Sequence, residues 1–252
     1  MDEPLHLVKI PLRADRLGSF GRSRGSSMRM LDEGYLVHSL LRELWQDLAP
    51  SPFVTRSQGR TVSVWGYGST DAHQMVEHAR LFGDPELVNV LDDVGGVASK
   101  PMPEFPAGRL VGFHVRTCPV VRLASSAAGH AKGAEVDAFL ARCFSSEPDT
   151  EVAREAVYVD WLRQRLAQTE VIGAVAEHVA VASMARTRLV RRTQGEVRDA
   201  HMLERPDVRF EGTLRVVNSA AFTNWLRRGV GRHRAFGFGA VLLVPPGMSL
   251  SR

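Results

Sequence analysis

Apolar residues in the first hundred positions recur with two different spacings, and each spacing predicts one kind of secondary structure. Short, mostly apolar runs that are typical of β-strands occupy residues 5–12, 53–56 and 60–67. Between the first two runs, residues 33–48 carry apolar side chains three or four positions apart, which is typical of one face of a helix. Asp32 fits the N-cap of this helix, and Pro50 and Pro52 end it.

The order of the remaining elements in this part predicts a fold. Residues 71–82 have a second helical pattern, and residues 94–100 form a fourth apolar run. Residues 13–29 contain three glycines and five arginines, and we expect a long polar loop there. The resulting order is β-α-β-β-α-β, which is the ferredoxin-like pattern.

The pattern starts again after a linker. Three prolines and a glycine lie within residues 101–108. Beyond the linker, strands or sheet-forming runs are expected at residues 110–116, 174–184, 186–192, 209–217 and 240–244. Helices are expected at residues 132–143, 153–167 and 219–227. We therefore predict an α+β protein with tandem ferredoxin-like (RAMP/RRM-like) domains at residues 1–104 and 105–252.

Composition excludes several classes of protein. The chain is 44% hydrophobic, which is ordinary for a globular protein, and no apolar run approaches the ~20 residues that span a bilayer. The N-terminal sequence MDEPLHLVKIPL lacks the basic start and apolar stretch of a signal peptide, so we expect a cytoplasmic protein without a membrane partner. Cys118 and Cys143 are too few and too isolated for a zinc site or a disulfide framework.

Arginine dominates the basic residues. Lysine occurs only at positions 9, 100 and 132 among 32 basic residues, and an arginine-rich coding bias accounts for part of this. Arginines gather in two clusters, Arg186/Arg188/Arg191/Arg192 and Arg227/Arg228/Arg232/Arg234. Such clusters are the electrostatic footprint of a nucleic-acid binder, although the first also fits a solvated strand face.

A glycine-rich segment near the C-terminus, RRGVGRHRAFGFGAVLLV, contains the second cluster. Its glycines are Gly229, Gly231, Gly237 and Gly239. They follow a helical pattern and precede a strand, which is the reverse of a Rossmann fingerprint, and no Walker A Lys-Ser/Thr follows. The segment disfavours a nucleotide cofactor and favours a cationic loop on an extended phosphate chain; an ordinary surface connection is the alternative.

Tyr35 and His38 are the candidates for chemistry, because a spacing of three residues puts them on one side of a helix. His38 falls at the edge of the apolar stripe and Tyr35 further out, and a structural role remains the alternative. His233 lies within the glycine-rich segment, where phosphate binding and catalysis are both open. The chain has no His-Glu-x-x-His motif.

Several stretches resemble one known family in their order along the chain. Tyr35-Leu-Val-His38, residues 112–122 (GFHVRTCPVVR), Trp161-Leu162-x-x-Arg165, Phe210-Glu211-Gly212 and the glycine-rich segment are similar to motifs of the CRISPR repeat-RNA endoribonucleases, most closely the CasE subfamily of Cascade. Thr117-Cys118 replaces the Ala-Asn of the family's Phe-x-Leu-Arg-Ala-Asn-Pro strand, and residues 62–105 have little that aligns. Type I-E and type IV relatives both remain open.

The resemblance implies an activity. It implies metal-independent cleavage of a CRISPR repeat hairpin, in which a 2′-hydroxyl attacks the adjacent phosphate and leaves a 2′,3′-cyclic phosphate and a 5′-hydroxyl. No cofactor is expected. His38, with a reference pKa of ~6.5, suits acid–base catalysis better than Tyr35 at ~10, which is assigned positioning or proton donation. Which residue is acid and which is base stays open.

The resemblance also implies partners, namely the repeat RNA hairpin or crRNA and other CRISPR effector-complex subunits. The residues expected to bind RNA are Arg22, Arg24, Arg29, Arg186, Arg188, Arg191, Arg192, Arg227, Arg228, Gly229, Gly231, Arg232, His233, Arg234, Gly237 and Gly239. A non-catalytic RNA-binding subunit of an effector complex is the main alternative, and a general RNA-modifying or chaperone protein is a weaker one.

Overall fold

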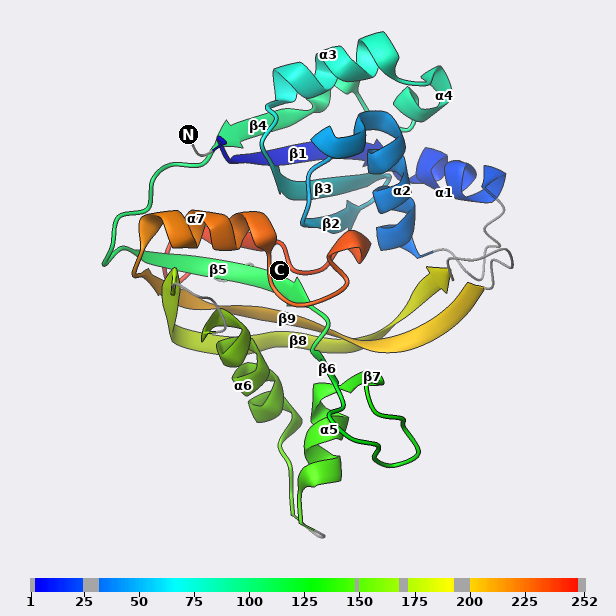
Figure 1. Cartoon of the computed structure of the whole chain (residues 1–252). Coiled ribbons are helices and arrows are strands. Elements are labelled where there is room, and N and C mark those ends of the chain that lie inside the picture. The colour runs from blue at the N-terminus through cyan, green and yellow to red at the C-terminus, as the bar shows by residue number, and fades with distance from the viewer. Residues whose placement is uncertain (1–2, 25–31, 148–149, 168–171, 193–199, 249–252) are drawn as a thin grey trace.

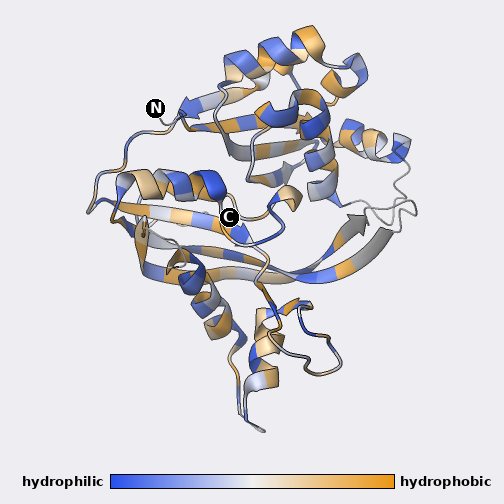
Figure 2. Cartoon of the chain, viewed as in Figure 1, coloured by the Kyte–Doolittle hydropathy of each residue, from blue (hydrophilic) through white to orange (hydrophobic). Residues whose placement is uncertain are grey.

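A computed structural model of the chain describes residues 3–24, 32–147, 150–167, 172–192 and 200–248, with side chains left undescribed at residues 190–192 and 200–202. Figure 1 shows two sheets, each with its own helices, and Figure 2 shows hydrophobic and hydrophilic residues interspersed along these elements. Within the described residues, no helix is long and apolar enough to cross a membrane.

The first sheet has the order β2-β3-β1-β4 with antiparallel pairing throughout. Its strands are β1 (His6–Arg13), β2 (Phe53–Gln58), β3 (Thr61–Gly68) and β4 (Ala98–Pro101). Two helices pack on it, α2 (Glu33–Trp45) and α3 (Ala72–Phe82), and they share a core with the strands. The buried Trp45 indole donates to the Met75 carbonyl at 2.8 Å and ties the two helices together.

The second sheet has the order β10-β5-β9-β8. Its strands are β5 (Leu110–Thr117), β8 (Ala174–Arg192), β9 (Ala200–Val216) and β10 (Val241–Val244), and its helices are α6 (Arg154–Ala167) and α7 (Ser219–Arg228). Both sheets place the unit's first strand between its third and fourth, which confirms the predicted ferredoxin-like α+β fold. Strands β8 and β9 are twice as long as β5, so their hairpin extends well beyond the sheet (Figure 1).

The prediction of a polar loop over residues 13–29 is wrong for residues 14–23, and residues 25–29 lie outside the described part of the chain. Residues Ala14–Ser23 form helix α1, in which Leu17 and Phe20 are buried against the first core. These two residues lie three positions apart and are the only large apolar side chains in the helix, so the stripe is too short to stand out among arginines and glycines.

The predicted helix at residues 132–143 begins later than expected. Residues Glu135–Asp137 form strand β7, which pairs with β6 (Val120–Arg122), and helix α5 (Ala138–Ser145) follows. The Asp137 side chain accepts the Phe139 amide at 2.8 Å and caps the helix there. The predicted strand at 94–100 likewise becomes a turn, η3 (Val94–Gly96), followed by β4. Three further short helices are α4 (Pro85–Val88), η2 (Gln46–Leu48) and η4 (Arg234–Phe236).

The two units share a packed boundary. The buried Tyr67 hydroxyl of β3 donates to the Val241 carbonyl of β10 at 2.6 Å. Leu5 and Tyr67 join the core of the second unit rather than that of the first. The last strand of the first sheet ends at Pro101 and the second sheet begins at Leu110; a division at residues 104/105 stays an interpretation of the sequence.

Candidate active site

Helix α2 positions both candidate catalytic side chains. The Asp32 carboxylate accepts the Tyr35 amide at 3.2 Å and caps the helix, as the sequence predicts. Leu36 and Leu40 lie in the first core and fix the rotation of the helix. Tyr35 and His38 therefore lie at the rim of the buried face, and both are half-buried.

The environment of His38 favours the neutral imidazole. Burial lowers the pKa of His38, and the positive charge of Arg42, one turn further along the helix, lowers it again. Among the described residues the imidazole has no hydrogen-bond or ion-pair partner. At neutral pH the ring is thus uncharged and able to accept a proton.

The C-terminal glycine loop, residues 229–239, closes over the N-terminal end of α2. The Tyr35 ring stacks on Phe236 with centroids 6.3 Å apart and an interplanar angle of 23°. A Cβ atom on Gly34 would lie 2.1 Å from the Phe236 carbonyl oxygen, so only glycine fits at position 34. Tyr35 is therefore less exposed than its helical position predicts, because a segment 200 residues away covers it.

The glycines of this loop serve its shape. Gly229, Gly231, Gly237 and Gly239 all have positive φ angles. The Gly229 amide donates to the Trp225 carbonyl at 2.9 Å and the Gly239 amide to the Arg116 carbonyl at 2.7 Å. These two amides are engaged within the protein, whereas the sequence suggested that the loop's glycines let amides approach a ligand.

The basic side chains of the loop differ in their partners. Arg232 and His233 both contact the Glu135 carboxylate, at 2.8 and 2.7 Å. The guanidinium of Arg234 donates to the backbone carbonyl oxygen of Arg228, the last residue of α7, and the side chains of both arginines are exposed. Arg227 instead contacts Glu3 near the N-terminus.

Arg116 of β5 is a site residue that the sequence analysis did not single out. It makes two hydrogen bonds to Asp207, at 2.9 and 2.6 Å, and its guanidinium lies 4.4 Å from the centroid of the Phe238 ring. Burial alone would lower the pKa of Arg116, but the Asp207 carboxylate, assisted by Glu33 and Asp32, raises it. Arg116 therefore links the glycine loop, the β8–β9 hairpin and the start of α2. In the sequence, the signal that could have identified Arg116 is its position in residues 112–122 (GFHVRTCPVVR), one of the stretches that carry the family resemblance.

The first arginine cluster lies on the β8–β9 hairpin. Arg186 and Arg188 are exposed, and Arg186 lies 3.6 Å from Glu204 on β9. Leu189 packs under the glycine loop against Phe238, and because neighbouring residues alternate across a strand, Arg186 and Arg188 share the face away from Leu189. The side chains of Arg191 and Arg192 lie outside the description.

The arginines near α1 lie beside the same helix as Tyr35 and His38. Arg24 forms an ion pair with Glu43 of α2 and lies 5.5 Å from the centroid of the Phe20 ring. Arg22 donates to the Ser19 hydroxyl at 2.8 Å. Arg29 lies outside the described residues.

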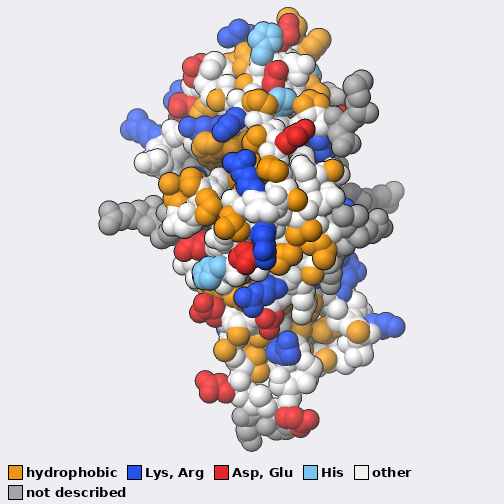
Figure 3. All heavy atoms as spheres, turned by 90° about the vertical axis from the view of Figure 1, so that its left-hand side faces the viewer, with side chains coloured by type: hydrophobic (Ala, Val, Ile, Leu, Met, Phe, Trp, Pro, Cys, Tyr) orange, Lys and Arg blue, Asp and Glu red, His pale blue; other side chains and the backbone are white. Residues whose placement is uncertain are grey.

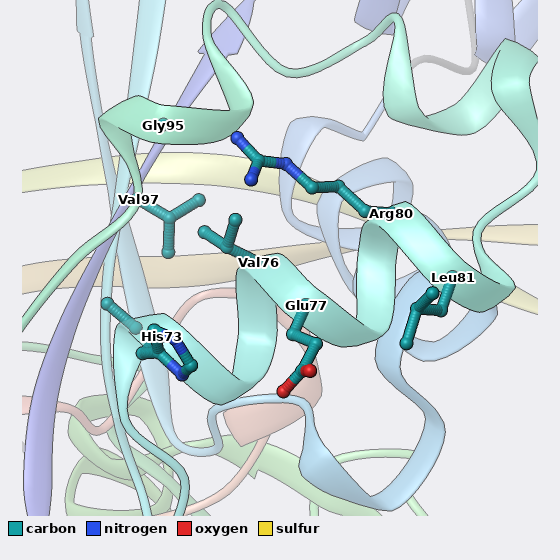
Figure 4. Close-up of a pocket in the computed structure, with 8 residues that line it drawn as sticks. His73, Val76, Glu77, Arg80, Leu81, Gly95 and Val97 are labelled. Atoms are coloured by element: carbon teal, nitrogen blue, oxygen red, sulfur yellow. The ribbon is translucent and has the colours of Figure 1, made fainter.

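The other surfaces described do not bring the predicted site residues together. An open pocket of about 440 Å³ lies between α3 and the η3–β4 segment, where Val76 and Arg80 extend from the helix toward Gly95 and Val97 (Figure 4). It contains none of the predicted site residues. On the face shown in Figure 3, basic side chains alternate with acidic and apolar ones and form no continuous basic patch. Within the described part of the chain, no group of three or more His, Cys, Asp or Glu side chains is placed to hold a metal ion.

Two tandem ferredoxin-like units with a Tyr-x-x-His helix under a C-terminal glycine loop define a class of α+β protein with its candidate site at the boundary between the units. The chain belongs to the CRISPR associated protein family, whose family model matches residues 5–245. No curated protein matches the chain.

Solved structures share the fold. CRISPR endoribonuclease Cse3 bound to a 19-nucleotide RNA is 22% identical with a TM-score of 0.62, over 96% of this chain and 100% of that one. Thermus thermophilus Cse3 bound to an RNA representing a pre-cleavage complex is 23% identical with a TM-score of 0.55, over 96% and 100%. A chain of a CRISPR RNA-guided surveillance complex is 14% identical with a TM-score of 0.53, over 96% and 99%.

Proposed function

We propose that this protein is a metal-independent endoribonuclease that cuts precursor CRISPR RNA at its repeat hairpin. Family membership and the fold shared with Cse3, an endoribonuclease bound to RNA, support this reaction class. The observation that carries the proposal for this chain is the closure of the glycine loop over α2. Through that contact the Tyr35 end of α2, the helix that also carries His38, lies against the glycine loop.

The proposed chemistry needs only these side chains. His38 removes the proton from the 2′-hydroxyl, and the resulting oxygen attacks the adjacent phosphorus. The bond from phosphorus to the 5′-oxygen breaks, the 5′-oxygen takes up a proton, and a 2′,3′-cyclic phosphate and a 5′-hydroxyl remain. Tyr35, held by its stack on Phe236, positions the phosphate or donates that proton. Exposed Arg228 and Arg234 stabilise the charge that develops on the phosphorane.

RNA binding is assigned mainly to the β8–β9 hairpin of the protein. Exposed Arg186 and Arg188 lie on a strand pair that projects beyond its sheet (Figure 1). An A-form stem offers phosphates and 2′-hydroxyls, which arginine recognises without reading sequence. Arg22, Arg24, Arg29, Arg191 and Arg192 are also assigned to RNA binding in the proposal.

The protein is further proposed to act in the cytoplasm and to stay with its product as an effector-complex subunit. The fold shared with a chain of a CRISPR RNA-guided surveillance complex supports this assignment.

Cleavage of the CRISPR repeat encoded beside this protein's own gene, with EDTA present, tests the proposal. We expect one cut in the intact hairpin and none when the stem is disrupted by mismatches. Binding of the intact hairpin without any cut would instead identify a non-catalytic RNA-binding subunit. Equal binding of both RNAs would point to a general RNA chaperone.

A further inference from the structure

Glu135 is an acidic side chain that contacts basic residues of the glycine loop. It lies on β7, in the segment inserted between β5 and α6. Its carboxylate contacts Arg232 at 2.8 Å and His233 at 2.7 Å in the glycine loop, and Arg205 of β9 at 3.3 Å. Two guanidinium groups and one imidazole, from two elements, thus converge on one carboxylate whose side chain is only 16% exposed.

The pairing keeps the carboxylate charged. Partial burial alone would raise the pKa of Glu135, but hydrogen bonds from His233 and Arg232 lower it to about 2. A permanent negative charge would weaken a site that only had to attract phosphate. The placement is instead suited to holding the loop in one conformation.

Glu135 fixes a residue that adopts an unusual backbone conformation. His233 has φ +60° and ψ +28°, the left-handed region that L-residues other than glycine seldom adopt. In this conformation its carbonyl accepts the Phe236 amide at 2.8 Å and closes the η4 turn. That turn presents the Phe236 ring to Tyr35 and the Phe236 carbonyl to Gly34.

We infer that Glu135 is a positioning residue, which holds His233 and thereby sets the glycine loop against the Tyr35 end of α2. The inference rests on the proposed function for its effect on the reaction rate. Its effect on the loop itself is independent of that function. Glu135 acts through His233 and Phe236 and does not touch the RNA.

The test compares Glu135→Gln with Glu177→Gln. Glu177 forms an ion pair with Arg215 elsewhere in the second sheet, so the control removes the same charge from a more exposed ion pair outside the site. Hydrogen exchange of the amides of residues 229–239 is measured without RNA, and cleavage rate and Kd are measured with RNA. Because Glu135→Gln loses charge-assisted hydrogen bonds, loop exchange should rise about tenfold or more and the rate at saturating RNA should fall by about tenfold or more. The Kd should change less than about threefold because phosphate contacts are not removed.

A double-mutant cycle that combines Glu135→Gln with His233→Gln tests whether Glu135 acts through His233. If Glu135 acts through His233, the two changes together should slow cleavage little more than either alone. If Glu135→Gln does not fold, His233→Gln alone tests the inference, because it should also raise the hydrogen exchange of the loop amides.

Two results overturn the inference. Unchanged loop exchange in Glu135→Gln would show that the carboxylate does not hold the loop. Tighter RNA binding with an unchanged rate would show that Glu135 only screens charge. If the wild-type protein itself leaves repeat RNA uncut, the proposed function fails, and loop exchange alone still decides the role of Glu135.

Discussion

Substituting Gly34 with alanine tests the contact between α2 and the glycine loop. The added Cβ would lie 2.1 Å from the Phe236 carbonyl oxygen, which is backbone and has no side-chain freedom to move away. Carbon–oxygen contacts in proteins lie at ~3.3–3.6 Å, so the loop and the helix must separate by at least about 1.2 Å. Tyr35 stacks on the residue that must move.

The size of the effect follows from this displacement. Overpacking costs about 1–3 kcal/mol, and the better helix propensity of alanine offsets about 1 kcal/mol of that, so the loss of stability should be small. A misplacement of about 1 Å at a reacting centre costs on the order of 100-fold in rate. We therefore expect a cleavage rate at saturating RNA about 100-fold lower, with a melting temperature only a few degrees lower.

Gly18→Ala is the matched control. Gly18 also lies within a helix, but a Cβ there would lie 3.5 Å from the end of the flexible Arg22 side chain, which is an ordinary contact. This variant should be as stable as the wild type or slightly more stable, and it should cleave at the normal rate. A Gly34→Ala protein with normal rate and normal stability would refute the close approach and the role assigned to it.

Two further predictions concern His38 and the arginines. Because the His38 imidazole acts in its neutral form and its pKa is lowered, the cleavage rate should be level near neutral pH and should fall only at pH values below the ordinary pKa of histidine. Arg42→Gln removes a positive charge beside the ring, so it should move this fall in rate to higher pH. An unchanged pH profile would show that Arg42 does not lower the pKa of His38. Arg186→Ala and Arg188→Ala should weaken binding and reduce the salt slope by about one unit each without lowering the saturated rate, whereas Arg234→Ala should also lower that rate. Identical profiles for all three would make the loop only another binding surface.

Local signals in the sequence predicted most of the elements and the helix that carries the candidate catalytic pair. The cap at Asp32 and the regular apolar spacing behind it define α2 without help from the rest of the chain. Helix α1 was missed because two buried side chains, Leu17 and Phe20, do not make a clear stripe, and its burial depends on docking against α2.

The contacts that complete the site could not be predicted, because each joins residues distant in sequence. The stack of Tyr35 on Phe236 depends on how the two units pack. The convergence of Arg232 and His233 on Glu135 depends on how β7 and the glycine loop pack within the second unit. The glycines illustrate the same limit. Their pattern correctly marked an unusual backbone, but whether their amides face a ligand or the protein is decided by tertiary contacts such as that of Gly239 with Arg116.

Single-turnover cleavage of the protein's own CRISPR repeat in EDTA, comparing wild type with His38→Ala and identifying the product ends, tests the central claim most directly. We expect wild-type cleavage to give a 2′,3′-cyclic phosphate and a 5′-hydroxyl, and His38→Ala to bind the RNA normally but cut it ~100- to 10,000-fold more slowly. Wild-type cleavage that requires added magnesium, or His38→Ala cleavage at the normal rate, would contradict the claim.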